Sequence, residues 1–201
     1  MARAYKSELR EAKAAETRET LLDALHDLLL EMSVEEVSIP KVAAAAGVTA
    51  PTAYRYFPTL EDLYRAFLER MRPQLGLDSQ SLSGLTPEGT PDLVAKLYRR
   101  FEKHGELLRR LIDSPTWTRV RLARNVDRFA ILEPAFADAS VLGRKQLKVA
   151  LGAIALFGSP STWRWLRDVW GLGAADAARA AEFATRAMIR ELREQGKGGS
   201  R

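Results

Sequence analysis

Residues 38–57 of the chain read Ser38-Ile39-Pro40-Lys41-Val42-Ala43-Ala44-Ala45-Ala46-Gly47-Val48-Thr49-Ala50-Pro51-Thr52-Ala53-Tyr54-Arg55-Tyr56-Phe57. This stretch predicts two short helices joined by a tight turn. Ser38 is a good N-cap for the first helix, Gly47 is typical of a helix end in the left-handed conformation, and Thr49 caps the second helix. Only Gly47 and Val48 separate the first helix from the next cap. The two axes must therefore cross steeply, as in a helix-turn-helix.

The second helix of a helix-turn-helix enters the major groove of DNA, so we interpret this stretch as DNA-binding. Chemistry and position together select the candidate contact residues Ser38, Lys41, Thr49, Ala50, Pro51, Thr52, Tyr54, Arg55 and Tyr56. Ala50 and Pro51 place a small apolar surface at the tip of the helix, which suits contact with thymine methyl groups. A pure capping role is equally consistent for Thr49, and a place in the core for Tyr54.

Apolar residues at helical spacing flank the stretch on both sides. Before it, a single stripe is formed by Leu21, Leu22, Leu25, Leu28, Leu29 and Met32. After it, Thr59 and Asp62 form a capping-box pattern that opens a further helix, and we expect Pro73 to bend or end this helix near Arg72. We expect Leu21, Leu25, Leu28, Leu29, Val42, Ala43, Val48, Tyr54, Phe57, Leu63 and Phe67 to form a shared core. Residues 1–72 are thus predicted to be a helix-turn-helix domain.

The charge of the chain does not by itself support DNA binding. The net charge is +5, yet residues 1–72 hold 10 Lys or Arg against 12 Asp or Glu. Attraction to phosphate depends on the contacting face more than on the sum over a domain. We expect residues 1–16 to be a mobile arm whose basic residues, Arg3, Lys6, Arg10 and Lys13, contribute to that face.

Residues 73–201 are predicted to form a larger helical domain. Residues 75–91 have the composition of a flexible loop, and helices are expected at 90–104, 106–113, 114–133, 141–157, 160–170 and 174–195. No run of β-branched residues alternates with a period of two, so we expect no strand. The predicted fold is therefore all-α.

Residues 17–71 resemble the DNA-binding domain of the TetR family of transcriptional regulators. The resemblance lies in the leucine-rich first helix, in Val42-Ala43-Ala44-Ala45-Ala46-Gly47-Val48-Thr49, in Tyr54-Arg55-Tyr56-Phe57 and in Glu61-Asp62-Leu63. It implies a homodimer whose C-terminal domain binds a small-molecule effector and dimerises through its last two long helices. The chain departs from the family pattern at Leu60, where a lysine is common, and at Tyr56, where a histidine is usual.

Aromatic residues of the C-terminal half could line an apolar effector pocket. The candidates are Tyr98, Phe101, His104, Trp117, Arg121, Phe157, Trp163 and Trp170, with Trp165 as a further aromatic residue. His104, Arg121 or Arg124 could orient a polar group of the ligand. The competing interpretation is that most of these aromatic side chains pack in the core or in a dimer interface, and that the arginines form a solvated face.

The helices expected at 141–157 and 174–195 are rich in small residues. Alanine is the best helix former, so such a helix need not be an interface. Two of them in one chain nevertheless favour a four-helix bundle between two copies, because a two-fold interface uses the same patch on both subunits. We therefore expect a homodimer.

Other functional classes find little support in the composition. The chain lacks cysteine, which excludes disulfides and thiolate metal sites, and it holds 2 histidines. We expect no catalytic site, no metal site and no cofactor. The longest apolar run, residues 149–157, is far shorter than the roughly 20 residues that span a bilayer, so we expect a cytoplasmic protein without membrane contact.

These observations predict a regulator, most simply a repressor, that binds a double-stranded DNA operator and responds to a small-molecule effector. One alternative is an all-helical ligand-binding protein or enzyme with an incidental helix-turn-helix. Another is a regulator controlled without any small-molecule ligand.

Overall fold

The computed structural model describes residues 2–123 and 125–198, and within these ranges the chain is all-α, as predicted. The first elements are α1 (Ala2–Glu31), η1 (Val34–Glu36), α2 (Ile39–Ala45), α3 (Ala50–Tyr56) and α4 (Leu60–Leu75). They are followed by α5 (Thr90–Lys103), α6 (Gly105–Asp113), α7 (Pro115–Leu122), α8 (Asn125–Leu132), η2 (Glu133–Leu142), α9 (Arg144–Phe157), α10 (Pro160–Arg164), η3 (Trp165–Val169) and α11 (Ala174–Gly198). In the described residues no helix is long and apolar enough to cross a membrane.

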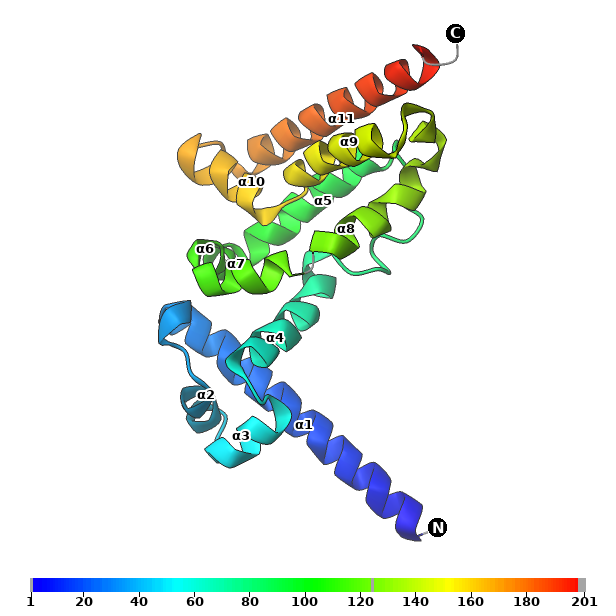
Figure 1. Cartoon of the computed structure of the whole chain (residues 1–201). Helices are drawn as coiled ribbons and strands as arrows, with labels where there is room; N and C mark the ends of the chain where they lie inside the picture. Colours follow the sequence, from blue (N-terminus) through cyan, green and yellow to red (C-terminus); the bar gives the residue numbers. More distant parts are fainter. Residues whose placement is uncertain (1, 124, 199–201) are drawn as a thin grey trace.

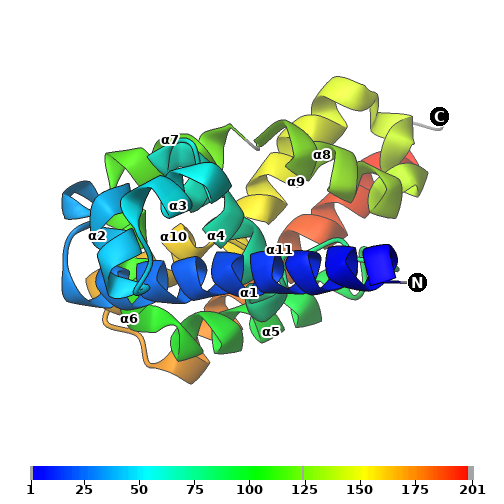
Figure 2. The same ribbon diagram turned by 90° about the horizontal axis from the view of Figure 1, so that it is seen from below.

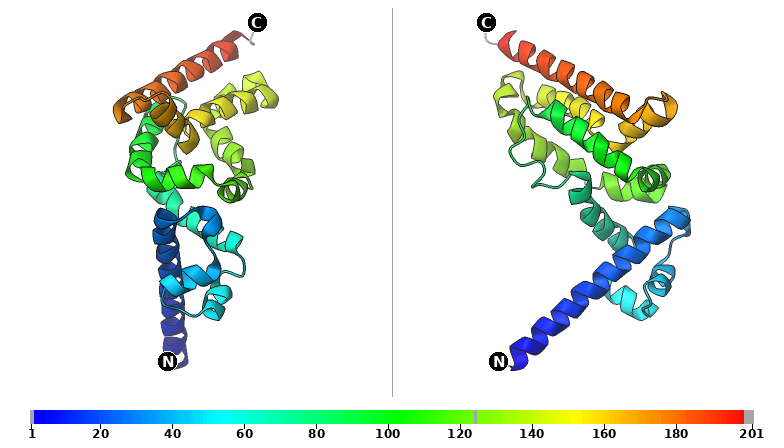
Figure 3. Two further views of the ribbon diagram at one scale, coloured as in Figure 1. Left: turned by 90° about the vertical axis from the view of Figure 1, so that its left-hand side faces the viewer. Right: turned by 180° about the vertical axis from the view of Figure 1, so that it is seen from behind.

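The helices form two groups at opposite ends of the molecule (Figure 1). We call α1–α4 the head and α5–α11 the body. The short helices α2 and α3 lie at the end of the head farthest from α9 and α11, and α4 runs from the head to the body. The N-terminal half of α1 projects beyond the other helices (Figure 3). The helix-turn-helix is thus at an extremity of the molecule.

The head has the core that the sequence predicts, with two exceptions. The buried side chains include Leu21, Leu25, Leu28, Leu29, Val42, Ala43, Phe57, Leu63 and Phe67. A large apolar side chain contributes about 1.5–3 kcal/mol when it is fully buried. Val48 is only partly buried, and Tyr54 is 46% exposed, so the expectation that Tyr54 packs in the core was wrong. The turn directs Ala53 and Phe57 inward, which leaves Tyr54 on the outer side of α3.

The body is held together by two apolar clusters. The larger one continues from the head through α5, α6 and α7 to Trp163 and to the small residues Ala177, Ala178 and Ala181 of α11. These alanines let α11 lie close along α5. The smaller cluster joins η2, α9 and α11 through Phe136, Leu147, Leu151, Ile154, Ile189 and Leu192. The small-residue face of α11 is therefore used within the chain.

The mobile arm expected over residues 1–16 was wrong, because α1 begins at Ala2. The segment is rich in alanine, glutamate, lysine and arginine, which are strong helix formers, so a helix continues where no apolar stripe requires one. The side chains of Arg10 and Lys13 are exposed on this helix, whereas those of Arg3 and Lys6 lie outside the described side chains.

Pro73 does not end α4 at Arg72, because the helix continues to Leu75. Gly76 has a φ of 71°, and its N–H donates to the carbonyl oxygen of Pro73 at 3.0 Å. The N–H of Leu77 donates to the carbonyl oxygen of Arg72 at 2.8 Å, which completes a Schellman motif. Pro73 thus lies in the last turn, where a missing N–H costs one hydrogen bond, and Gly76 is the true stop signal.

Other expected helices also have different bounds, and the one expected at 160–170 is divided into α10 and η3. The helix expected at 114–133 is divided into α7 and α8, and Arg124 lies outside the described residues. Asn125, at the start of α8, is weak in helix interiors and favoured at helix ends, which fits this division. The helix expected at 141–157 begins only at Arg144, because Gly143 has a φ of 76°, outside the helical region.

Candidate nucleic-acid interface and the neighbouring cavity

The turn between α2 and α3 has the predicted caps. The Ser38 hydroxyl accepts from the Lys41 N–H at 3.5 Å, and the Thr49 hydroxyl accepts from the Thr52 N–H at 3.4 Å. Gly47 has a φ of 66°, and the Val48 N–H donates to the carbonyl oxygen of Ala43 at 2.9 Å. These bonds satisfy backbone groups that both helix ends leave free. The local sequence therefore fixes the direction in which α3 leaves the turn.

Replacing Gly47 by alanine should lower the free energy of unfolding by about 1–2 kcal/mol, the cost of a left-handed conformation for a residue with a Cβ atom. A Cβ atom at Gly47 would meet no other atom within 4 Å, so this cost comes from the backbone alone. Gly47→Asn is the matched control, because asparagine adopts this conformation more readily. Urea unfolding followed by circular dichroism measures both. Equal losses for the two variants would contradict this explanation.

Helix α3 has one buried face and one exposed face. Ala53 and Phe57 point into the head and are 1% and 3% exposed. Pro51, Tyr54 and Arg55 are exposed on the other side. In the view from below, α3 lies beside α1 without being covered by the body (Figure 2). A helix with a buried apolar face and an exposed polar face at an extremity can dock into a groove of a partner.

Arg55 and Tyr56 lie at the C-terminal end of α3. The Arg55 guanidinium lies 5.3 Å from the centroid of the Tyr56 ring, a cation–π distance that orders the side chain without neutralising its charge. Tyr56 is partly buried. Ala50 and Thr52 are also partly buried, and the Thr49 and Thr52 hydroxyls lie 2.9 Å apart. The exposed cation of α3 is therefore presented beside an aromatic ring.

Lys41 lies at the N-terminal end of α2, next to Ser38. Its Nζ donates to the carbonyl oxygen of Glu36 at 2.8 Å, and its side chain is exposed. Hydrogen bonds from the backbone and side chain of Ser33 lower the pKa of Glu36, and the charge of Lys41 lowers it further. A cation is thus fixed at a helix N-terminus, a combination suited to a phosphate group.

The nine residues predicted to contact DNA all lie at the start of α2 or between Thr49 and Tyr56, so the structure brings them into one region. Sequence reasoning missed Arg18 of α1. Its guanidinium lies 5.6 Å from the centroid of the Phe57 ring, at the end of α3, and its Nη1 pairs with Glu19 at 3.2 Å. The sequence feature that could have indicated Arg18 was its place three positions before the leucine stripe of the first helix.

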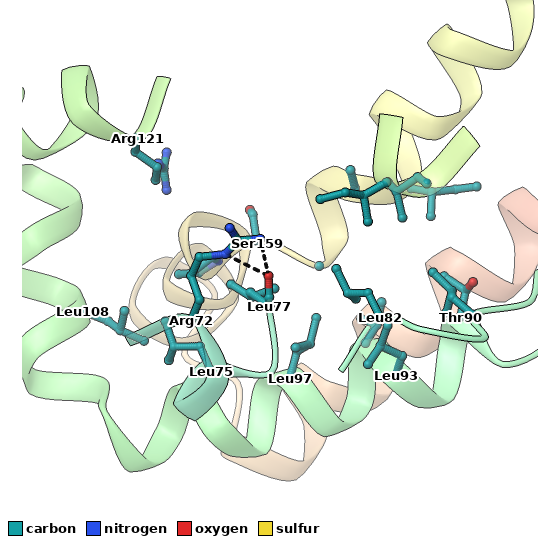
Figure 4. A pocket seen from close by; sticks show the side chains of 18 of the residues that line it. Arg72, Leu75, Leu77, Leu82, Thr90, Leu93, Leu97, Leu108, Arg121 and Ser159 are labelled. Atoms are coloured by element: carbon teal, nitrogen blue, oxygen red, sulfur yellow. Dashed lines mark hydrogen bonds between the residues drawn. The ribbon is translucent and has the colours of Figure 1, made fainter. Parts of the chain in front are cut away.

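A cavity of about 160 Å³ lies where the head meets the body (Figure 4). Its walls come from α4 to α10 and from the loop 77–85. Most of the lining side chains are apolar, and they include Leu75, Leu77, Leu93, Leu97, Leu108 and Ile154. Its size matches cavities that bind a ligand of the bulk of benzene. The cavity is therefore a candidate site for a small apolar ligand.

Two arginines reach the cavity, and their surroundings differ. Arg72 donates from Nε and Nη2 to the carbonyl oxygen of Leu77 at 3.0 and 2.8 Å, and its Nη1 lies 3.5 Å from a Glu69 oxygen. Arg121 donates from Nη1 to the Ser161 hydroxyl at 3.2 Å. Burial lowers the pKa of Arg121 below its ordinary value. Arg72 is thus well partnered, whereas Arg121 has a neutral partner.

Of the eight residues predicted to bind an effector, the structure brings Trp117 and Arg121 to the cavity. The other six lie elsewhere. Tyr98, Phe101 and Trp163 are completely buried in the core, where Trp163 Nε1 donates to Glu102 at 2.7 Å. His104 lies at the junction of α5 and α6, Phe157 packs beside the larger cluster, and Trp170 is 68% exposed.

The cavity wall consists mainly of leucines, which sequence reasoning did not single out. Leu77, Leu82 and Leu85 belong to the segment that was interpreted as a flexible loop. The recurrence of leucine in a segment otherwise rich in glycine and serine was the sequence feature that could have indicated this part of the cavity wall. Aromatic residues were expected instead, because they supply the most apolar surface per residue, but large rings are also the residues that fill a core.

Helix α7 connects the cavity to the head. Trp117, which lines the cavity, has its ring 6.3 Å from that of Tyr64 and 6.2 Å from that of Phe67. The Ser114 hydroxyl donates to the Glu35 carboxylate at 2.7 Å. Helix α4 makes a second connection, since Leu68, Arg72 and Leu75 line the same cavity. A ligand in the cavity would therefore touch α4 of the head and α7, which packs against the head.

Comparison with known proteins identifies the head. Residues 21–67 match the family of bacterial regulatory proteins called the tetR family. The head therefore carries the sequence pattern of the tetR family. The chain is 36% identical over 61 residues to the HTH-type transcriptional repressor BepR of Brucella suis biovar 1 (strain 1330). This alignment covers 30% of the chain and spans 29% of the length of BepR, so the likeness holds for less than a third of either protein.

Solved structures resemble the chain over most of its length. A tetR-family transcriptional regulator from Streptomyces coelicolor has a TM-score of 0.61 and 21% identity, over 92% of this chain and 86% of that one. NalD, the secondary repressor of the MexAB-OprM multidrug efflux pump in Pseudomonas aeruginosa, has a TM-score of 0.61 and 22% identity, over 88% of this chain and 96% of that one. At these identities the likeness concerns the fold.

Proposed function

We propose that this protein is a DNA-binding transcriptional regulator, a repressor that leaves its operator when a small molecule binds. In this proposal residues 1–72 read DNA, and residues 73–201 bind the effector and form a homodimer. The observation that carries the proposal is the tetR-family helix-turn-helix, whose second helix exposes Pro51, Tyr54 and Arg55 at an extremity of the molecule. BepR and NalD, which resemble the chain, are repressors by name.

The contacts to DNA divide into two kinds. Lys41, Ser38 and the N-terminus of α2 suit the phosphate backbone, which positions a protein without reading sequence. Thr52 and Arg55 of α3 suit base edges, because threonine bonds to several bases and arginine forms paired hydrogen bonds with guanine. Few polar groups face outward on α3, so we expect the operator to be specified by a small number of base pairs.

The outer faces of α9 and α11 support a homodimer. Val149 and Leu156 of α9 are 70% and 57% exposed, and Phe183 of α11 is 76% exposed. Gly152 and Ala153 lie between the two exposed residues of α9, and a Cβ atom at Gly152 would meet no atom within 4 Å. Exposed apolar residues around a flat, small-residue surface suit close packing against the same surface of a second copy.

Selection of DNA from a random duplex library tests the proposal and does not require the operator sequence at the outset. We expect enrichment of one sequence with two inverted half-sites about one helical turn apart, as two-fold related helix-turn-helix units require. The DNA upstream of the protein's own gene serves as an independent probe. Enrichment of no sequence over several rounds, with retention no better than for random DNA, would contradict the regulator proposal.

A further inference from the structure

Arg121 is a cavity arginine that pairs with no carboxylate among the side chains that the structure describes. It projects from α7 toward the space that the leucines surround (Figure 4). Its side-chain hydrogen bond there goes to the Ser161 hydroxyl, and none of the carboxylates whose side chains the structure describes forms an ion pair with it. A guanidinium carries five N–H donors in a planar fork. Most of its N–H donors therefore have no acceptor among the described side chains, and they are available to water or to a ligand.

Partial burial of the Arg121 guanidinium is energetically unfavourable for its charged form. The described residues that line the cavity include two arginines and no aspartate or glutamate, and Arg72 already bonds to Leu77 and approaches Glu69. A partly buried charge with a neutral partner is destabilised until an opposite charge reaches it. Burial also lowers the pKa of Arg121, in agreement with this view. The site is thus complementary to an anion.

The remaining walls restrict which anion fits. Leu75, Leu97, Leu108 and Ile154 offer no hydrogen bonds, so the rest of the ligand must be apolar. A carboxylate matches the planar fork of a guanidinium in a paired geometry. A dianion such as a phosphate monoester would bring a second charge into an apolar space that offers it no further unpaired cation among the described lining residues. One negative charge on an apolar body suits the site best.

We propose that the cavity binds an amphipathic monocarboxylate, whose carboxylate pairs with Arg121 and whose apolar body lies among the leucines. The body has roughly the bulk of benzene or of a medium alkyl chain. This inference deepens the proposed function, on which it rests, by naming the chemical class of the effector. Ser161 holds the guanidinium in place, and Trp117, on the same helix, lies at the edge of the bound ligand.

Isothermal titration calorimetry of the full chain tests the ligand class with matched probes. Octanoate, 1-octanol and octylamine share one alkyl chain and differ in charge, and 3-phenylpropanoate with 3-phenyl-1-propanol repeats the comparison with a ring. We expect each acid to bind about tenfold or more tightly than its alcohol, because hydrogen bonds between charged groups are the strong ones. We expect octylamine to bind most weakly. Alcohols that bind as tightly as the acids would overturn the proposal.

Variants of α7 assign the effect to one side chain. Arg121→Met should weaken octanoate about tenfold or more and leave 1-octanol unchanged, and Arg121→Lys should restore part of the loss because it keeps the charge. Arg119→Met removes an arginine of the same helix that does not line the cavity and should change neither affinity. Octanoate should also alter tryptophan emission, and Trp117→Phe should remove that signal. Equal octanoate affinity in Arg121→Met and the unaltered protein would overturn the assignment.

DNA titrations on the same preparations separate this inference from the proposed function. If the protein binds its selected duplex but neither acid at millimolar concentration, the ligand class is wrong and the regulator proposal stands. If octanoate binds through Arg121 and leaves the DNA complex intact, the ligand class stands and release by this ligand is wrong. Binding of octanoate that also releases the duplex is the result we expect.

Discussion

Arg55→Ala should weaken binding to the selected duplex by about tenfold to a hundredfold and leave the fold unchanged. Paired hydrogen bonds from an arginine to guanine are worth about 1–3 kcal/mol, and each 1.4 kcal/mol is a factor of about ten in affinity. The side chain is exposed and stacks on the Tyr56 ring, so its removal leaves no buried group without a partner. Fluorescence anisotropy gives the affinity, and circular dichroism confirms the fold.

The matched control for this substitution is Arg65→Ala. Arg65 is also an exposed arginine of the head, but it pairs with Glu61 at 3.0 Å and with Asp62 at 3.3 Å on α4. Both substitutions remove one positive charge, and only Arg55 lies on α3. A loss of affinity of the same size for both variants would mean that bulk charge, and not the α3 face, determines binding.

Leu156→Glu should convert the dimer to monomers and weaken operator binding by about a hundredfold or more. In the proposed dimer a two-fold axis brings the same patch of both copies together, so the substitution would place two carboxylates in one apolar interface. An uncompensated buried charge costs about 3–5 kcal/mol, which corresponds to roughly a hundredfold to several thousandfold in the dimer dissociation constant. Sedimentation velocity measures the dimer, and anisotropy measures operator binding.

Leu122→Glu is the control for this second substitution. Leu122 is a leucine of similar exposure, 52% against 57%, on α7 and away from the outer faces of α9 and α11. We expect it to leave the dimer intact. The dimer proposal fails at this surface if the unaltered protein sediments as a monomer at micromolar concentration, or if Leu156→Glu and Leu122→Glu dimerise equally.

Local signals predicted residues 38–62 of the head well because the helix ends in this segment are marked by residues with a single strong role. Ser38, Gly47 and Thr49 set the turn, and Thr59 with Asp62 forms the expected capping box, whose hydroxyl and carboxylate groups lie 2.7 Å apart. Such signals act within four residues and can be read from a sequence. Pro73 misled the prediction because a proline is a helix breaker in the interior, whereas here Gly76 follows within three residues.

The cavity could not be predicted because it depends on contacts between distant segments. Arg121 is one of several arginines in the expected 114–133 helix, and only the tertiary structure turns it toward Ser161, 40 positions later in the chain. Tyr98, Phe101 and Trp163 belong to faces that other helices cover completely. Composition gives the amount of aromatic surface, and the packing of helices decides whether it lines a cavity or fills a core.

The central claim is that α3 reads a specific DNA sequence, and a salt-dependent anisotropy titration tests it most directly. The full chain is titrated with the selected duplex and with a scrambled duplex of equal length at increasing salt concentration. We expect the selected duplex to bind about a thousandfold or more tightly than the scrambled one, with both affinities falling steeply as salt rises. Equal affinity for the two duplexes at every salt concentration would contradict the claim.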